Sequence, residues 1–188
     1  IHFHAIGDRA IHDCLDAVAA ARAANVYADN RHHMAHLQFL NPKDISRFAH
    51  LGVAANLQML WACDDEQMAE LVTPFVGDRH AWQYPFRSLQ EAGARLAAGS
   101  DWSVSTPDPW AAIHVAVNRI PPEHPTDRAE AFLPEQRLSL AAAISAYTSG
   151  SAWVNHLDHL VGTIEVGKEA DLVVVDRNPF TIKPAELA

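Results

Sequence analysis

The sequence predicts an α/β fold in which parallel strands alternate with helices, and three observations support this prediction. A short apolar segment followed by a segment of helical periodicity recurs four times between residues 1 and 119. Helix-start signals, such as Asn41-Pro42 and Asp108-Pro109, stand between these segments. Hydrophobic residues make up 49% of the 188 residues and charged residues 20%, which is the balance of an ordinary globular domain.

The first two strand–helix units have clear boundaries. Residues 1–4 are predicted to form a strand, and residues 9–24 a helix whose apolar face is Ile11, Cys14, Leu15 and Val18. A second strand is expected at residues 33–38. The helix after it begins at the cap Asn41-Pro42 and ends at Gly52.

The third and fourth units follow the same order. Residues 53–57 are the third predicted strand, and the acidic cluster 64–66 is predicted to open a helix to about residue 72, because negative charge stabilises a helix N-terminus. Residues 95–98 are the fourth strand. Asp101 follows the end of this strand. Asp108 is predicted to cap a helix that runs to about residue 119.

The C-terminal part changes character. Residues 121–134 contain four of the 11 prolines and are predicted to be a surface loop, after which Ser139 caps a helix over residues 140–148, with a second helical piece near residues 151–156. Residues 162–166 and 171–176 are predicted to be two strands joined by a tight turn. Residues 1–155 are thus expected to form one unit, and residues 160–188 the strands of a small β domain.

Four such units are compatible with two architectures. They can form a small doubly wound domain, or they can be half of an eight-stranded barrel, which needs about 250 residues in full. The periodicity does not distinguish the two. The chain begins at Ile1, in an apolar segment and without an initiator Met, so we expect it to be the C-terminal part of a longer protein.

Charge and composition limit the partners that we expect. The 14 Lys and Arg residues against 23 Asp and Glu residues leave a net charge of −9, which does not favour nucleic acid or an anionic membrane surface. No apolar run approaches the roughly 20 residues that span a bilayer. Cys14 and Cys63 are isolated, which predicts no disulfide framework and is typical of a reducing, cytoplasmic compartment.

Three polar residues stand at the carboxyl ends of predicted strands: His4, His36 and Asp101. Functional groups gather at that edge of a parallel sheet, and imidazole nitrogen with carboxylate oxygen is a donor set that suits zinc. The alternative is that each residue merely makes a local hydrogen bond, as a single histidine at a strand end usually does. Spacing alone leaves the two interpretations about equal.

Several motifs resemble the metal-dependent amidohydrolase superfamily, in the branch of N-substituted formamide deformylase-like proteins. They are His4-Ala5-Ile6-Gly7-Asp8-Arg9-Ala10, Arg31-His32 leading to His36-Leu37-Gln38, Gly99-Ser100-Asp101, Ala146-Tyr147-Thr148, and the ending from Gly162 to Asp176. The order and spacing of these motifs cover nearly the whole chain.

The resemblance implies the C-terminal half of a (β/α)8 TIM-type barrel with part of an appended β-sandwich. It implies one or two divalent metal ions, most simply zinc, with iron or manganese as alternatives. His4 and His36 would be the metal ligands on the fifth and sixth strands of the barrel. Asp101, after the eighth strand, would bind metal and shuttle a proton. The implied reaction is hydrolysis of an amide or related C–N bond, other than a peptide bond, in a small molecule.

The chain also departs from the family pattern. The first-strand His-x-His pair and the bridging Lys or Glu of the fourth strand have no counterpart here. Ala35 and His33 replace residues that are commonly Glu and Arg in relatives. His2-Phe3-His4 imitates the missing pair, but we interpret His2 as pointing into the barrel without binding metal.

Two other functions remain open. The chain can be a catalytically silent half-barrel, which would expose two sheet edges and pair with another copy, as a homo-oligomer, or with a complementary fragment. A doubly wound domain with a nucleotide ligand ranks last, because the sequence has no G-x-G-x-x-G or P-loop pattern.

Overall fold

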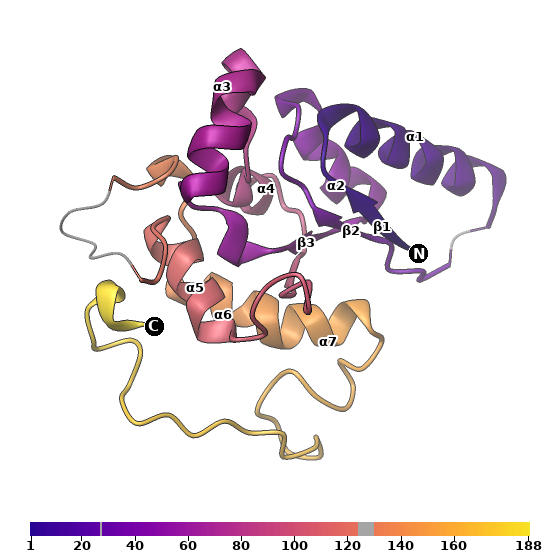
Figure 1. Cartoon of the computed structure of the whole chain (residues 1–188). Coiled ribbons are helices and arrows are strands. Elements are labelled where there is room, and N and C mark those ends of the chain that lie inside the picture. Colours follow the sequence, from indigo (N-terminus) through magenta and orange to yellow (C-terminus); the bar gives the residue numbers. More distant parts are fainter. Residues whose placement is uncertain (27, 124–129) are drawn as a thin grey trace.

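A four-stranded parallel sheet forms the centre of the computed structural model, which describes residues 1–26, 28–123 and 130–188 (Figure 1). The strands are β1 (His2–Ala5), β2 (His33–His36), β3 (Ala54–Leu57) and β4 (Leu96–Ala98). They lie side by side in chain order, and each neighbouring pair is parallel. The predicted α/β fold with a parallel sheet is therefore confirmed.

The helices cover the sheet in the order of the chain. Helix α1 (Asp8–Ala24) packs against β1, α2 (Ile45–Leu51) against β3, and α4 (Phe86–Glu91) against α2. Helices α6 (Leu140–Ser145) and α7 (Ser151–Val154) pack against β4, and α5 (Pro109–Asn118) packs against α6. The predicted apolar face of α1 is the packed one, with Ile11, Leu15 and Val18 buried and Cys14 half-buried.

Three predicted helix caps are formed. Asn41 Oδ1 accepts the backbone N–H of Lys43 at 3.0 Å, which opens a 3-10 turn (Pro42–Asp44) ahead of α2. Asp108 Oδ1 accepts the N–H of Trp110 at 2.9 Å, and Ser139 Oγ accepts that of Ala142 at 3.2 Å. Each of these bonds satisfies a backbone donor that the helix cannot satisfy itself.

Gly150 brings a helical segment very close to β4. It ends a π-helical turn (Ala146–Gly150), and a Cβ at this position would lie 2.1 Å from the carbonyl oxygen of Leu96. The hydroxyl of the next residue, Ser151, donates to the carbonyl of Ala98 at 2.8 Å. These contacts hold the carboxyl end of β4 in place, three residues before Asp101.

The helix predicted to end near residue 72 is longer in the structure. Asp65 Oδ1 accepts the N–H of Met68 at 2.7 Å. A π-helical turn (Met68–Val72), α3 (Thr73–Val76) and a 3-10 turn (Gly77–Trp82) then follow without a break. This segment projects from the body of the molecule (Figure 1). Met68 is buried at its base, whereas Leu71 and Phe75 on its other side are exposed.

The two strands predicted at residues 162–166 and 171–176 are not formed. The chain is irregular there, and Val173 and Val174 are 82% and 95% exposed. A strand needs a hydrogen-bonding neighbour, and none of the described residues lies beside this segment as one. The end of the chain returns to α5, where Asn118 Nδ2 donates to the carbonyl of Pro184 at 2.9 Å (Figure 1).

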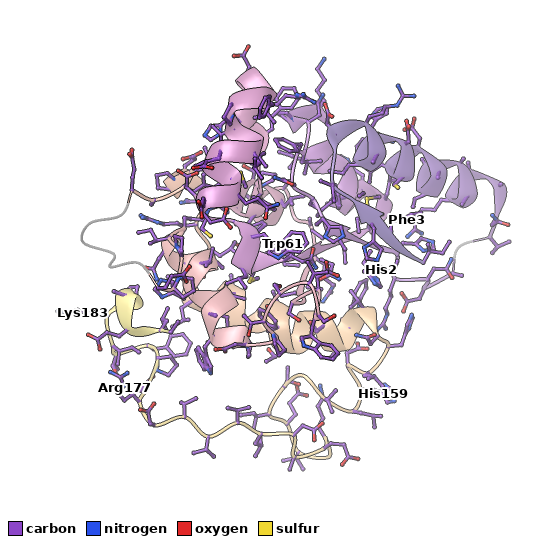
Figure 2. The ribbon with its side chains drawn as sticks, viewed as in Figure 1. His2, Phe3, Trp61, His159, Arg177 and Lys183 are labelled. Atoms are coloured by element: carbon purple, nitrogen blue, oxygen red, sulfur yellow. The ribbon has the colours of Figure 1, made fainter. Side chains whose placement is uncertain are left out.

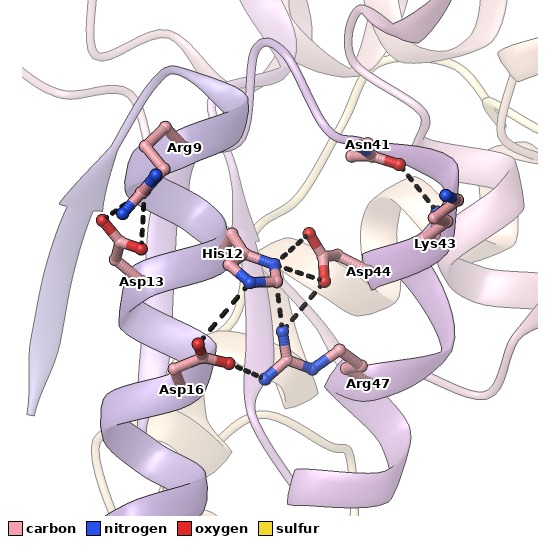
Figure 3. Close-up of polar contacts among 8 residues, drawn as sticks. All are labelled: Arg9, His12, Asp13, Asp16, Asn41, Lys43, Asp44 and Arg47. Atoms are coloured by element: carbon pink, nitrogen blue, oxygen red, sulfur yellow. Dashed lines mark hydrogen bonds and ion pairs between the residues drawn. The ribbon is translucent and has the colours of Figure 1, made fainter.

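A polar cluster joins α1 to the start of α2 (Figure 3). His12 Nδ1 lies 3.0 Å from Oδ2 of Asp44, and Arg47 Nη1 donates to Oδ1 of Asp44 at 2.9 Å. Arg47 Nη2 donates to Asp16, which extends the cluster back to α1. The imidazole of His12 is thus a contact between the two helices, although its side chain is 49% exposed.

One predicted loop lies partly outside the residues that the structure describes. Residues 124–129, in the middle of the proline-rich loop predicted at 121–134, lie outside the described residues.

Among the helices that the structure does describe, none is both long enough and apolar enough to cross a membrane.

Candidate active site

The imidazoles of His4 and His36 meet at the carboxyl edge of the sheet. His4 lies in β1 and His36 ends β2, and His4 Nδ1 is 2.8 Å from His36 Nε2. Their ring centroids are 4.9 Å apart. The structure therefore brings together two of the three residues that the sequence predicted as metal ligands.

The backbone at the end of β2 explains how this contact forms. In the register of the two strands His36 stands opposite Ala5, not His4, so a regular strand would direct its side chain to the other face of the sheet. Instead His36 and Leu37 have φ values of 76° and 53°, in the left-handed region that residues other than glycine seldom adopt. Such strained residues cost about 1–3 kcal/mol each and cluster at functional sites.

Polar contacts hold this strained turn. The backbone N–H of His36 donates to Oε1 of Gln58, which follows β3, and the N–H of Leu37 donates to the carbonyl of Ala5 at 3.1 Å. Gln58 is 4% exposed. Sequence reasoning missed Gln58, although a polar residue directly after a strand was the signal that identified the other candidates.

The surroundings of His36 favour its neutral form. Its ring stacks on the indole of Trp61, with centroids 5.2 Å apart and an angle of 7° between the planes. Burial lowers the pKa of His36, and the positive form of His4 would lower it further, while the Asp101 carboxylate opposes both effects. His36 Nδ1 is buried and has no hydrogen-bond partner.

Asp101 lies beyond β4, close enough for its charge to act on His36. It adopts a left-handed φ of 56°, and its carbonyl accepts the N–H of Val104 at 2.8 Å. Ser105 Oγ donates to the carbonyl of Ser100, which ties the following loop back to the residue before Asp101. In the described part of the chain, no three His, Cys, Asp or Glu side chains form a group that could hold a metal ion. Asp101 as a third ligand therefore stays a prediction.

The histidine contacts extend along the sheet. The His2 ring lies 4.7 Å from that of His4 and 4.6 Å from that of His33, with all distances between ring centroids. Burial, the neighbouring imidazoles and the N-terminal amino group all lower the pKa of His2. His2 and Phe3 emerge on opposite sides of β1, and Phe3 packs against the apolar core (Figure 2).

A cavity of about 610 Å³ lies close to the His4–His36 pair, because its wall includes Trp61, which stacks on His36. Residues that follow each of the four strands contribute to its wall, among them Ile6, Gln38, Trp61 and Ser105. Two of the aromatic residues that the structure describes contribute to this wall. Trp61 and Tyr84 line this cavity, Trp82 does not, and exposed Trp102 is also absent from its wall.

A larger cavity of about 930 Å³ lies elsewhere, between α5, α7 and the irregular residues 161–180, with Trp110 in its wall. None of the three predicted ligand residues lines either cavity. We assign the candidate site to the smaller cavity, because residues that follow the four strands line it and because Trp61 in its wall stacks on His36.

Two buried polar residues lie near this cavity and were not predicted. Arg119 is fully buried; its Nε donates to the carbonyl of Phe132 at 2.8 Å and its Nη1 to that of Tyr84 at 3.2 Å. Burial lowers the pKa of Arg119 to about 10. His114, 1% exposed in α5, has no hydrogen-bond partner at either ring nitrogen, and burial lowers its pKa.

The chain is similar to larger proteins. It is 37% identical over 182 residues to the protein LONG AFTER FAR-RED 3 of Arabidopsis thaliana, covering 96% of this chain and 30% of that protein. It is 28% identical over 188 residues to N-substituted formamide deformylase of Arthrobacter pascens, covering 98% of this chain and 33% of the relative. The chain thus spans about a third of the length of these relatives.

A solved structure shares the fold. An uncharacterized metal-dependent hydrolase from Pyrococcus horikoshii OT3 superposes with a TM-score of 0.78 at 26% identity, over 98% of this chain and 35% of the other. The sequence profile described as "Amidohydrolase family" matches residues 1–188, the whole chain. The chain therefore belongs to the amidohydrolase family.

Proposed function

We propose that this chain carries part of the active site of a metal-dependent hydrolase that cleaves an amide or related C–N bond, other than a peptide bond, in a small molecule. The contact between His4 Nδ1 and His36 Nε2, 2.8 Å apart at the carboxyl edge of the sheet, carries this proposal. Membership of the amidohydrolase family and likeness to a metal-dependent hydrolase support it.

The residues present fit a divalent metal. The facing nitrogens, His4 Nδ1 and His36 Nε2, are 2.8 Å apart, and among the described residues no other side chain bonds to the His36 ring, whose buried Nδ1 has no partner and whose face stacks on Trp61. A lowered pKa keeps His36 neutral, which is the form that binds metal. With the Asp101 carboxylate, the donors are two nitrogens and an oxygen, a set that suits zinc and also iron or manganese.

Each of these residues has a distinct role in the proposed reaction. His4 and His36 would hold one metal ion or share in holding two. When bound, such a metal supplies Lewis acidity toward a carbonyl oxygen and toward water. Asp101 would accept a proton from the attacking water and then donate it to the leaving nitrogen as the C–N bond breaks. The products are a carboxylic acid and an amine.

The architecture belongs to the same proposal. We propose that residues 1–155 form the last four strand–helix units of a (β/α)8 barrel and that residues 160–188 belong to a small β-sandwich. The exposed side chains of Leu172 and Val173 to Val175, and the single neighbours of β1 and β4, agree with surfaces that other strands would cover. N-substituted formamides are candidate substrates, because a relative of this chain is named for their deformylation.

The test is turnover by the complete protein with an N-substituted formamide or a simple amide. Asp101→Asn keeps the size of the side chain but removes the proton acceptor, so it should abolish turnover while the circular dichroism spectrum stays unchanged. Glu130→Gln, an exposed carboxylate outside the site, is the matched control and should retain full activity. Undiminished turnover by Asp101→Asn would overturn the assignment.

A second candidate function is favoured by the two open sheet edges. Strands β1 and β4 each pair on one side only among the described residues. A catalytically silent chain would then act as an assembly piece, associating with another copy or with a complementary fragment. Light scattering distinguishes the two: a chain that forms a metal-free dimer with no turnover supports the second candidate.

A further inference from the structure

The cavity beside His36 has a chemical character that the family assignment does not specify. Its volume of about 610 Å³ is in the range that holds a small organic molecule. Trp61 lines this cavity and also stacks on the His36 ring, so the cavity lies next to a proposed metal ligand. One of the two groups joined by the reacting C–N bond would therefore extend into this space.

Most of the wall is apolar. The residues with apolar side chains that line it include Leu60, Met68, Val72, Val104, Pro121 and Pro122. Met68 is 5% exposed and Pro121 is buried. Transfer of a hydrocarbon or aromatic group from water into this space is favourable in proportion to the area that it buries.

The charged residues in the wall are both acidic. They are Asp65 and Glu123, both exposed to solvent at the rim, and among the described residues no Lys or Arg lines the cavity. Both carboxylates lie close enough to Cys63, which also lines the cavity, to raise the pKa of its thiol. The Asp65 carboxylate is held at the wall, because its Oδ1 accepts the N–H of Met68 at 2.7 Å.

Arg119 is a buried cation near this cavity, and its charge opposes those of Asp65 and Glu123 at Cys63, but its side chain is engaged elsewhere. Arg119 lies behind Tyr84, and its guanidinium donates to the carbonyls of Tyr84 and Phe132 and stands over the rings of Phe86 and Phe132. It does not line the cavity. The wall therefore combines an apolar surface with two negative charges, and a ligand that complements it has an apolar body and a positive charge.

We propose that this cavity binds an apolar, positively charged group, such as an arylalkyl ammonium, on the leaving-nitrogen side of the substrate. This inference rests on the proposed function for the identity of the reaction. Asp65 and Glu123 would act as specificity residues that face the cation, and Trp61 with the surrounding aliphatic side chains would contact its apolar body. The hydrolytic product on this side is itself an amine.

The test uses two probes that differ in charge. Phenethylamine is a cation at neutral pH, and phenethyl alcohol has the same number of heavy atoms without a charge. Binding of each to the 188-residue chain is measured by ligand-observed NMR or calorimetry in the presence of EDTA, so that metal plays no part. We expect the cation to bind about fivefold more tightly, because two partly solvated carboxylates attract it.

Substitution of the two carboxylates tests whether they cause the preference for the cationic probe. In Asp65→Asn combined with Glu123→Gln the two probes should bind within about twofold of each other, with the affinity for the alcohol unchanged. Asn keeps an oxygen that can accept the Met68 N–H, so the helix start is preserved. Glu70→Gln removes one negative charge from the same helical segment outside the cavity and should keep the preference.

Three results would overturn the inference: equal affinity for the two probes in the unaltered chain, a preference that survives the double substitution, or no binding of either probe by a chain that circular dichroism shows to be folded. The outcome is separate from that of the proposed function. Failure of metal-dependent turnover with a retained cation preference rejects the hydrolase, whereas turnover without the preference rejects this inference alone.

Discussion

The indole of Trp61 lies flat against the imidazole of His36, with ring centroids 5.2 Å apart and planes 7° from parallel. Trp61 Nε1 also donates to Ser105 Oγ at 3.4 Å, and Ser105 in turn donates to the carbonyl of Ser100, next to Asp101. Trp61 therefore connects His36 to the loop that carries Asp101. We interpret it as a positioning residue for the proposed metal centre.

Trp61→Ala should weaken metal binding without unfolding the chain. Loss of the stacking surface frees the His36 ring to rotate, and loss of partners that orient a metal-ligating histidine typically costs about 10- to 100-fold in affinity. Titration with Co²⁺, followed by visible absorption, measures this affinity directly. Trp61→Phe keeps a flat ring and should recover most of it.

The matched control for this experiment is Trp102→Ala. Trp102 is 72% exposed and follows Asp101 directly, so its removal tests whether any aromatic residue near the site would have the same effect. Equal loss of Co²⁺ affinity in the two alanine variants would contradict the positioning role of Trp61.

The His12–Asp44–Arg47 cluster should contribute to stability. The Asp44 side chain is 5% exposed and accepts from both His12 and Arg47, so Asp44→Ala leaves two polar groups without a buried partner. We expect the free energy of unfolding to fall by about 2 kcal/mol, measured by urea denaturation. Asp13→Ala, which removes a solvent-exposed pair with Arg9 on the same helix, should change little. Equal effects of the two substitutions would refute this role.

Cys63 should be unreactive in the folded chain. Burial, together with the charges of Asp65 and Glu123, raises the pKa of its thiol from 9.0 to about 12, so almost no thiolate exists at pH 8. A disulfide reagent such as DTNB should therefore label Cys63 only after guanidinium unfolds the chain. Rapid labelling of Cys63 under native conditions, identified by mass spectrometry, would contradict the burial of this thiol.

The raised pKa of the Cys63 thiol also predicts how the stability of the folded chain depends on pH. The folded thiol keeps its proton up to about pH 12, whereas the unfolded thiol releases it from about pH 9. The folded state thus binds more protons between these values, so the contribution of Cys63 is complete below pH 9 and is lost as pH rises toward 12. Cys63→Ala should flatten this part of the stability curve.

Local patterns in the sequence predicted much of the fold. The apolar spacing of α1 and the caps at Asn41, Asp108 and Ser139 depend on residues a few positions apart, and the structure has all of them. The strands were placed correctly because each is a short apolar run followed by a helix. The predicted strands near Val173 are absent, because a strand forms only where a neighbour supplies its hydrogen bonds.

The site was less predictable than the fold. His4 and His36 were identified from their places at strand ends, but the register of β1 and β2 would have kept them apart. Their contact depends on the left-handed turn at His36 and Leu37, which no residue type there favours. The roles of Gln58 and Trp61 depend on contacts between separate units, which are not visible in any local pattern.

The most direct test of the account is the zinc stoichiometry of the purified 188-residue chain, measured by elemental analysis after equilibration with a range of Zn²⁺ concentrations. We predict saturable binding of about one ion per chain, weaker than at a closed four-ligand site, because of the three predicted ligands only His4 and His36 are in contact. His4→Ala and His36→Ala should each abolish saturation, whereas His159→Ala, an exposed histidine away from the pair (Figure 2), should not. Zinc binding that is unchanged in His4→Ala and His36→Ala would contradict the central claim that these two imidazoles form the metal centre.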